Sequence, residues 1–369
     1  MFSLGQDKQP KIGVSPPWRK HWQAMLSDYV TGLTWSPDGK FLAAISAAGE
    51  VVVCDNFPEP SLKYLQDKTG GSMDCISISG DGKFVAAGGQ EGKVKVWQVD
   101  AKEGELIATL EWGNWIDKLC WSPKENWLAF NVGSEAIVWD AGRKENLARL
   151  NFETSSILAI AWQPGGEYLA IGGNLGVKVW DRRDWHKSPY HLDLPSASVA
   201  IAWSVDGEFL AAGNLDNSVL VLSFSNPDSW SMLGFEGKVR QLAWSDRPTT
   251  LGAPLLAIAS AEQVTIWEKQ FDESIGWDGW ELSGHLDVVQ AIAFQPQTFH
   301  LASAAEDGQV CIWYDAEQVW QMLPGAPDGF SCLAWHPKNE FLAAAGANGE
   351  LLIWSQSNPG QKFARSWPN

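Results

Sequence analysis

Residues 34–44 read Thr-Trp-Ser-Pro-Asp-Gly-Lys-Phe-Leu-Ala-Ala, and this stretch decides the fold. The residues up to Trp35 form the end of an alternating strand. Ser-Pro-Asp-Gly then reverses the chain, because proline fixes φ and Asp-Gly accepts turn conformations. Phe-Leu-Ala-Ala begins a second strand, whose small residues let neighbouring sheets approach closely. The stretch therefore predicts an antiparallel hairpin.

The same hairpin recurs along the chain, each time with one apolar anchor at the end of its first strand. The eight anchors are Trp35, Ile78, Trp121, Trp162, Trp203, Trp244, Phe294 and Trp335. From the first to the last there are seven steps over 300 residues, a mean of about 43, which is the period of one four-stranded propeller blade. The longer step after Trp244 indicates an insertion in the sixth unit, at residues 246–254.

Two further strands complete each unit, and together with the anchors they account for most of the 23 Trp. A third strand ends in Trp in six units, at Trp97, Trp139, Trp180, Trp267, Trp313 and Trp354. An outer fourth strand is indicated by Trp230, Trp280 and Trp320, each 14 or 15 residues before the next anchor. Eight units of four strands predict an all-β chain.

These segments resemble the WD-repeat family, whose blades carry Gly-His before the first strand and Trp-Asp at the end of the third. Trp-Asp occurs at Trp139-Asp140 and Trp180-Asp181, and Gly-His at Gly284-His285. The resemblance implies a closed eight-bladed β-propeller of four-stranded antiparallel blades. It also implies a buried hydrogen-bonded network in unit seven with a structural role, made by His285, Ser303, Asp307 and Trp313.

Closure of the ring has two candidate strands. Residues 22–26 stand before the first anchor and fit as the outer strand of the last blade, which removes an open sheet edge. Residues 363–367 compete for the same place, and we favour the N-terminal strand. The predicted organisation is an N-terminal extension over residues 1–20 and a single propeller domain over residues 21–369.

Charge and composition exclude several classes of function. The formal net charge is −17, so the surface repels phosphate backbones and anionic membranes, and neither nucleic acid nor a membrane is expected as a partner. No stretch of about 18 apolar residues is present and residues 1–15 lack the apolar run of a signal peptide, which predicts a cytoplasmic protein. The five Cys lie far apart and are expected to be reduced core thiols.

No pattern of catalytic or metal-binding residues stands out. The sequence lacks a nucleophile elbow, a P-loop and an HExxH helix, so we predict no catalytic residue and no cofactor. His186 and His191 match no standard metal-ligand spacing, and Lys187 lies between them, so no metal is expected. A small-ligand or metal-binding propeller, or an enzyme that uses the central channel, stays open as an alternative.

The turns between second and third strands carry acids, and the resemblance places them on one face of the ring. We expect a partner-binding rim from Glu50, Glu91, Glu135, Asp216, Glu262, Glu306, Asp307 and Glu350. Tyr29 and Trp115 open first strands on the same face and would add aromatic contacts. The loop tryptophans considered for recognition are Trp18, Trp112, Trp115, Trp185 and Trp277. The combination predicts a scaffold or adaptor that binds another protein through a basic segment.

Overall fold

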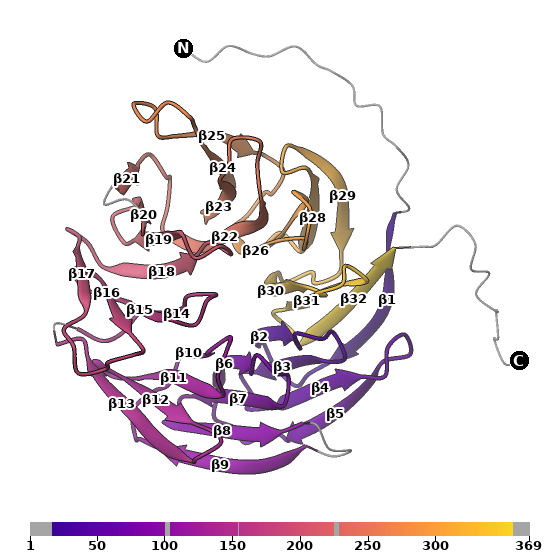
Figure 1. Ribbon diagram of the computed structural model, residues 1–369. Helices are drawn as coiled ribbons and strands as arrows, with labels where there is room; N and C mark the ends of the chain where they lie inside the picture. Colours follow the sequence, from indigo (N-terminus) through magenta and orange to yellow (C-terminus); the bar gives the residue numbers. More distant parts are fainter. Residues whose placement is uncertain (1–16, 100–103, 154, 225–228, 357–369) are drawn as a thin grey trace, which may run out of the picture.

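The computed structural model describes residues 17–99, 104–153, 155–224 and 229–356, and these form a ring of eight sheets (Figure 1). Each sheet has four antiparallel strands, and the prediction of an eight-bladed β-propeller is confirmed. The first strands of successive blades contact one another around the whole ring, including the last blade with the first. The ring is therefore closed.

The strands follow chain order within the blades. Blade 1 contains β2 (Val30–Trp35), β3 (Leu42–Ser46), β4 (Val51–Asp55) and β5 (Ser61–Gln66). Blade 2 contains β6 (Met73–Ile78), β7 (Phe84–Gly89), β8 (Lys93–Gln98) and β9 (Glu105–Glu111). Blade 3 contains β10 (Leu119–Trp121), β11 (Trp127–Val132), β12 (Glu135–Asp140) and β13 (Glu145–Asn151). Blade 4 contains β14 (Ala159–Trp162), β15 (Tyr168–Gly173), β16 (Gly176–Asp181) and β17 (Tyr190–Asp193).

The second half of the ring repeats this order until the last blade. Blade 5 contains β18 (Ser198–Trp203), β19 (Phe209–Asn214), β20 (Val219–Ser223) and β21 (Ser229–Met232). Blade 6 contains β22 (Val239–Pro248), β23 (Pro254–Ser260), β24 (Gln263–Lys269) and β25 (Trp277–Leu282). Blade 7 contains β26 (Val289–Phe294), β27 (Leu301–Ala305), β28 (Gln309–Tyr314) and β29 (Gln318–Pro324). Blade 8 contains β30 (Phe330–Trp335), β31 (Phe341–Gly346), β32 (Glu350–Gln356) and β1 (Trp18–Met25).

The N-terminal strand closes the ring, as predicted. Strand β1 pairs antiparallel with β32, from Trp18 opposite Gln356 to Met25 opposite Glu350 (Figure 1). The propeller begins at Trp18, three residues before the predicted domain boundary, because this buried side chain is already part of the core between blades 7 and 8. The competing segment, residues 363–367, lies outside the described residues.

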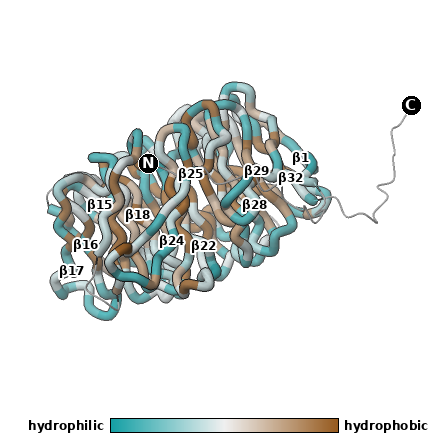
Figure 2. Tube along the Cα trace, turned by 90° about the horizontal axis from the view of Figure 1, so that it is seen from above, coloured by the Kyte–Doolittle hydropathy of each residue, from teal (hydrophilic) through white to brown (hydrophobic). Residues whose placement is uncertain are grey.

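The anchor tryptophans join neighbouring blades by hydrogen bonds as well as by packing. In five of them the indole N–H donates to the backbone carbonyl of the residue before the anchor position in the preceding blade. The donor and acceptor pairs are Trp35 and Ala334, Trp121 and Ser77, Trp203 and Ala161, Trp244 and Ala202, and Trp335 and Ala293, at 2.9–3.3 Å. Figure 2 shows the hydrophobic residues along the strands and hydrophilic ones in many of the loops.

The insertion in blade 6 lies where the sequence predicts it. In seven blades the anchor pairs with the residue seven positions later, as Trp35 does with Leu42. In blade 6, Trp244 pairs with Leu256, twelve positions later, and β22 extends until Pro248 pairs with Pro254. The extra residues lengthen one hairpin and leave the blade intact.

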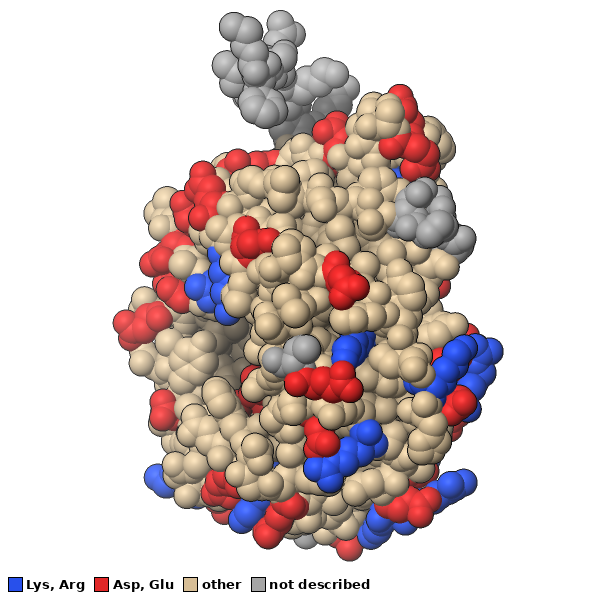
Figure 3. Space-filling model, turned by 90° about the vertical axis from the view of Figure 1, so that its left-hand side faces the viewer, with Lys and Arg blue, Asp and Glu red and all other residues tan. Residues whose placement is uncertain are grey.

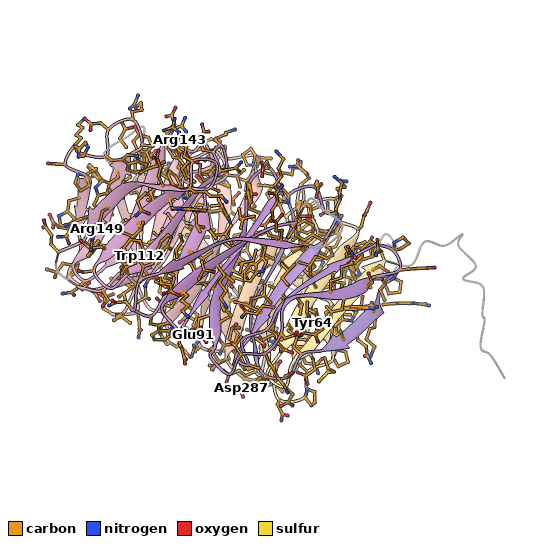
Figure 4. All side chains as sticks on the ribbon, turned by 90° about the horizontal axis from the view of Figure 1, so that it is seen from below. Tyr64, Glu91, Trp112, Arg143, Arg149 and Asp287 are labelled. Carbon is orange, nitrogen blue, oxygen red and sulfur yellow. The ribbon has the colours of Figure 1, made fainter. Side chains whose placement is uncertain are left out.

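The loops divide between two faces, because neighbouring strands are antiparallel. The front face consists of the loops between second and third strands and the loops that lead into the next blade. The back face consists of the loops between first and second strands and between third and fourth strands. Figure 4 shows Glu91 and Asp287 on the front face and Arg143 on the opposite, back face.

Candidate partner-binding face

Four of the predicted acids are exposed on the front face, and they come from four different blades. They are Glu91, Asp216, Glu262 and Glu306. Glu135 is half-buried, and its carboxylate already forms an ion pair with Arg149 of the neighbouring strand β13. The predicted acids therefore differ in exposure and in the contacts that they already make within the chain.

Glu50 is buried and is not part of the surface, so its prediction as a partner-binding residue is wrong. Its carboxylate accepts hydrogen bonds from the backbone N–H of Ser27 at 2.9 Å, the hydroxyl of Ser27 at 2.8 Å and the hydroxyl of Ser46 at 2.6 Å. The residue stands directly before β4, where its side chain turns inward. Glu50 therefore fastens the loop after β1 to blade 1.

The prediction for Glu350 is wrong for the same reason. Glu350 is the first residue of β32, it is buried, and its carboxylate accepts a hydrogen bond from the backbone N–H of Asn348 at 3.0 Å. Spacing from the turn could not distinguish these two positions from exposed ones, because it does not show which loop groups bind the carboxylate: Ser27 of the loop after β1 for Glu50, and Asn348 of its own turn for Glu350.

Asp307 belongs to the network of blade 7 and has little exposed surface. His285 Nδ1 lies 2.9 Å from its carboxylate, and the backbone N–H of Leu286 donates to the same oxygen at 3.0 Å. His285 Nε2 lies 2.7 Å from the hydroxyl of Ser303, which also accepts a hydrogen bond from the indole of Trp313 at 2.8 Å. The structure brings these four predicted residues together in a buried hydrogen-bonded network, which joins the loop before β26 to strands β27 and β28.

Trp115 is the exposed member of the five loop tryptophans. Trp18 and Trp277 are buried in strands, whereas Trp112 packs against Phe130 and Trp185 packs between other indoles. The Trp115 side chain has a fractional exposure of 56%, in the loop that leads into β10. It is the one with a broad ring surface available for contact.

Asp74 holds Trp115 in place, and sequence reasoning missed it. The indole N–H of Trp115 donates to one carboxylate oxygen of Asp74 at 2.6 Å, and the hydroxyl of Ser72 donates to the other at 2.6 Å. Asp74 occupies the irregular position between Met73 and Cys75, where the pairing of β6 with β7 shifts register. The only sequence signal was a carboxylate in a first strand whose other residues, apart from Ser77, are apolar.

The charges beside Trp115 are predominantly negative. Lys93 lies 3.8 Å from Glu91 and 3.6 Å from Glu111, and Lys118 pairs with Asp117 at 2.8 Å. With Asp74, these are four carboxylates and two ammonium groups on the strands and loops next to Trp115, whose loop meets the β7–β8 turn where the backbone N–H of Trp112 donates to the carbonyl of Gly92 at 2.9 Å. We name this group, Trp115 with Asp74, Glu91, Glu111 and Asp117, the Trp115 cluster.

Tyr29 lies across the front face in the loop before β2 and is 38% exposed. Burial, followed by the electrostatic effect of the nearby Cys332, raises the pKa of its phenol further above neutral pH. Four leucines on the same face also escaped sequence reasoning, although each interrupts a polar loop. They are Leu175, Leu215, Leu233 and Leu286, with fractional exposures of 46, 52, 73 and 92%.

The described residues show three further features that bear on other kinds of site. Among these residues, no three His, Cys, Asp or Glu side chains gather as a metal site, and His186 and His191 have no third partner of this kind. All five thiols are free, and burial raises the pKa of Cys54, Cys120, Cys311 and Cys332 to about 12. The described part of the chain holds no helix long and apolar enough to cross a bilayer.

The family model described as WD domain, G-beta repeat, matches more than half of the chain. It matches residues 19–55, 61–98, 144–181, 188–222, 278–314 and 318–355. The chain belongs to the WD-repeat family. Each match runs from the outer strand of one blade to the third strand of the next, so the WD repeat is offset from the blade by one strand.

The two longest internal stretches of this WD-repeat chain that fall outside the matches, residues 99–143 and 223–277, both depart from the regular blade. One contains the three-residue strand β10 and the loop of Trp115, and the other contains the insertion of blade 6.

Two curated relatives share the name small ribosomal subunit protein RACK1. The Caenorhabditis elegans protein is 28% identical over 157 residues, 40% of this WD-repeat chain and 48% of the relative. The Drosophila melanogaster protein is 27% identical over 165 residues, 42% of this chain and 51% of the relative. The chain thus spans about half the length of the curated relatives it matches.

Proposed function

We propose that this WD-repeat protein is an interaction scaffold whose front face binds a basic segment of a partner protein at the Trp115 cluster. The observation that carries the proposal is an exposed indole fixed by Asp74 inside a surplus of carboxylates. An aromatic side chain held in one orientation loses little entropy on binding, and Trp is enriched at binding hot spots.

The surrounding charges define the chemistry of the partner. A Lys or Arg side chain that reaches Glu91 or Glu111 can place its aliphatic stem or its cation against the Trp115 ring. The exposed leucines lie on blades 4 to 7 of the same face, so they favour an apolar residue in a part of the partner that extends beyond the Trp115 cluster. Because the net charge of the whole chain is −17, its field also favours the approach of a basic segment.

The curated relatives support a role in holding other proteins, since their name places them in the small ribosomal subunit. They also support the cytoplasmic location expected from the sequence. We do not propose that this chain binds the ribosome, because a net charge of −17 disfavours contact with RNA phosphates. The proposed role is binding and not catalysis.

The test uses a partner captured on the parent protein and then measured in purified form. Glu91→Lys, Glu262→Lys and Glu306→Lys together reverse three exposed front-face acids. The reversal should weaken binding at low salt by on the order of tenfold or more, with a smaller effect at about 1 M salt, where screening is strong. Trp115→Ala should instead raise the dissociation rate and leave the salt dependence unchanged.

A matched control changes charge equally on the back face. Glu59→Lys, Glu167→Lys and Glu317→Lys reverse three exposed back-face acids and should alter association much less. If both triple variants weaken binding equally, the loss of affinity comes from the change in net charge and not from the front face. If the front-face triple variant binds like the parent, the proposed face is wrong.

A further inference from the structure

A pocket of about 400 Å³ opens on the side of the ring between blades 3 and 4. Its walls are strand β13 of blade 3 and strands β16 and β17 of blade 4, and the loop between these last two strands forms its back-face edge. The residues that matter below are Arg149, Glu153, Lys178, Trp185 and Lys187. Figure 4 shows Arg149 on the side of the ring, between the two faces.

Positive charge exceeds negative charge in this pocket, in contrast to the chain as a whole. Arg149, Lys178 and Lys187 line it, and Glu153 is the one carboxylate among the lining residues. A larger pocket of about 720 Å³ on the back face has three Lys against four carboxylates in its lining. Figure 3, which faces the left-hand side of Figure 1, shows Lys and Arg mainly in its lower half, where Asp and Glu also lie.

Lys178 is buried, with a fractional exposure of 8%, at a third-strand position where blade 3 carries Ile137 and blade 2 carries a partly buried lysine, Lys95. Its ammonium group donates to the carbonyl of Phe152 at 2.9 Å, and the carboxylate of Glu153 lies 3.6 Å away. An ammonium group has three donors and is costly to bury without strong partners. Glu153 is a weak partner, since its side chain is 70% exposed.

The other two cations converge on the same space from both walls. Arg149 pairs with Glu135, but a guanidinium has five N–H donors and Glu135 takes only part of them. Lys187 lies on the loop after β16, which Trp185 fixes by packing against Trp127 and Trp162. The backbone N–H of Lys187 donates to the carbonyl of Asp184 at 3.2 Å, which shapes the turn.

We propose that this pocket binds a phosphoryl group. Three cationic side chains from two blades and a loop surround one small space, which suits an oxyanion with several oxygens and about two negative charges better than a single carboxylate. The volume is near the lower end of ligand pockets, so it accommodates the phosphate with a small body attached. The site lies on a different surface from the Trp115 cluster and takes the opposite charge, so each proposal can fail alone.

Inorganic phosphate is the first probe, titrated into the full chain by calorimetry and ³¹P NMR at constant ionic strength. We expect saturable binding of one phosphate per chain. Lys187→Gln and Arg149→Gln should each weaken it about tenfold, the usual effect of losing a hydrogen bond to a charged group. Lys40→Gln removes an exposed cation from the larger pocket and should change nothing.

Lys178 is left unchanged in this test. Because it is buried, its replacement would destabilise the fold, and a folding defect would resemble a loss of binding. O-phosphoserine and a short phosphoserine peptide, each with its unphosphorylated form, separate the two sources of the group. A peptide that binds more tightly than O-phosphoserine identifies a phosphorylated protein segment, and equal affinities identify a small phosphate ester. Absence of saturable phosphate binding, or equal binding by the parent and both pocket variants, would overturn the proposal.

Discussion

Trp18 fastens the ring, and replacing it measures the strength of the closure. Trp18 is buried in β1, and its ring centroid lies 5.1 Å from that of Trp335, in an edge-on arrangement. Its backbone N–H donates to the side chain of Gln321 at 2.9 Å, and its carbonyl accepts from the same amide at 2.8 Å. The residue therefore joins the N-terminal strand to blades 7 and 8 at once.

Trp18→Ala removes the whole indole from this junction. Truncation of a buried Trp destabilises a protein by about 3–5 kcal/mol. At about 2 °C per kcal/mol for a large domain, the melting temperature should fall by about 6–10 °C. Differential scanning calorimetry and circular dichroism on the full chain give this shift directly.

Two variants make the result specific. Trp18→Phe keeps an aromatic side chain at this position and removes a buried indole N–H that has no hydrogen-bond partner among the described residues. It should therefore lower the melting temperature much less than the alanine variant does. Trp115→Ala removes an exposed indole and should leave the melting temperature nearly unchanged. If Trp18→Ala also melts within a degree or two of the parent, β1 does not fasten the ring and the reasoning fails.

Three further variants test buried polar contacts. Ser303→Ala removes the hydroxyl shared by Trp313 and His285, and chemical denaturation should show a loss of about 1–3 kcal/mol. Glu50→Lys should abolish soluble folded protein, whereas reversal of an exposed front-face acid should not, as gel filtration will show. Burial lowers the pKa of His336 below 6.5, so the unfolded chain binds a proton at this residue more readily than the folded chain. The free energy of unfolding should therefore fall as the pH drops through 6.5. His336→Gln should reduce this dependence of the free energy of unfolding on pH, as measured by denaturation curves. An unchanged slope would show that other groups cause the pH dependence.

The repeat allowed the fold to be predicted in detail because each blade satisfies the same local rules. The anchor, the Asp-Gly turn and the small residues of the second strand recur at fixed spacing, and even the insertion after Trp244 was visible as a longer step. Pairing of β1 with β32 followed from the position of Trp22 before the first anchor. Short-range chemistry and a constant period were enough for these conclusions.

The site was harder to predict, because exposure at a loop depends on its neighbours from other blades. Glu50 and Glu91 both stand near turns, yet one is enclosed by Ser27 from the previous blade and the other faces solvent. Trp115 could be selected as an aromatic loop residue. Its contact with Asp74 joins positions 41 residues apart in the chain, and no spacing rule indicates that pairing.

The offset between repeat and blade has a consequence for biosynthesis. Strand β1 is made before the rest of the ring, but its partner β32 is made last, more than 300 residues later along the chain. At about 5–20 residues per second this interval lasts on the order of half a minute, during which β1 has no partner. Strand β1 carries Arg19 and Lys20, which are both exposed in the finished ring. Charged side chains of this kind disfavour the pairing of an unpaired strand with another chain.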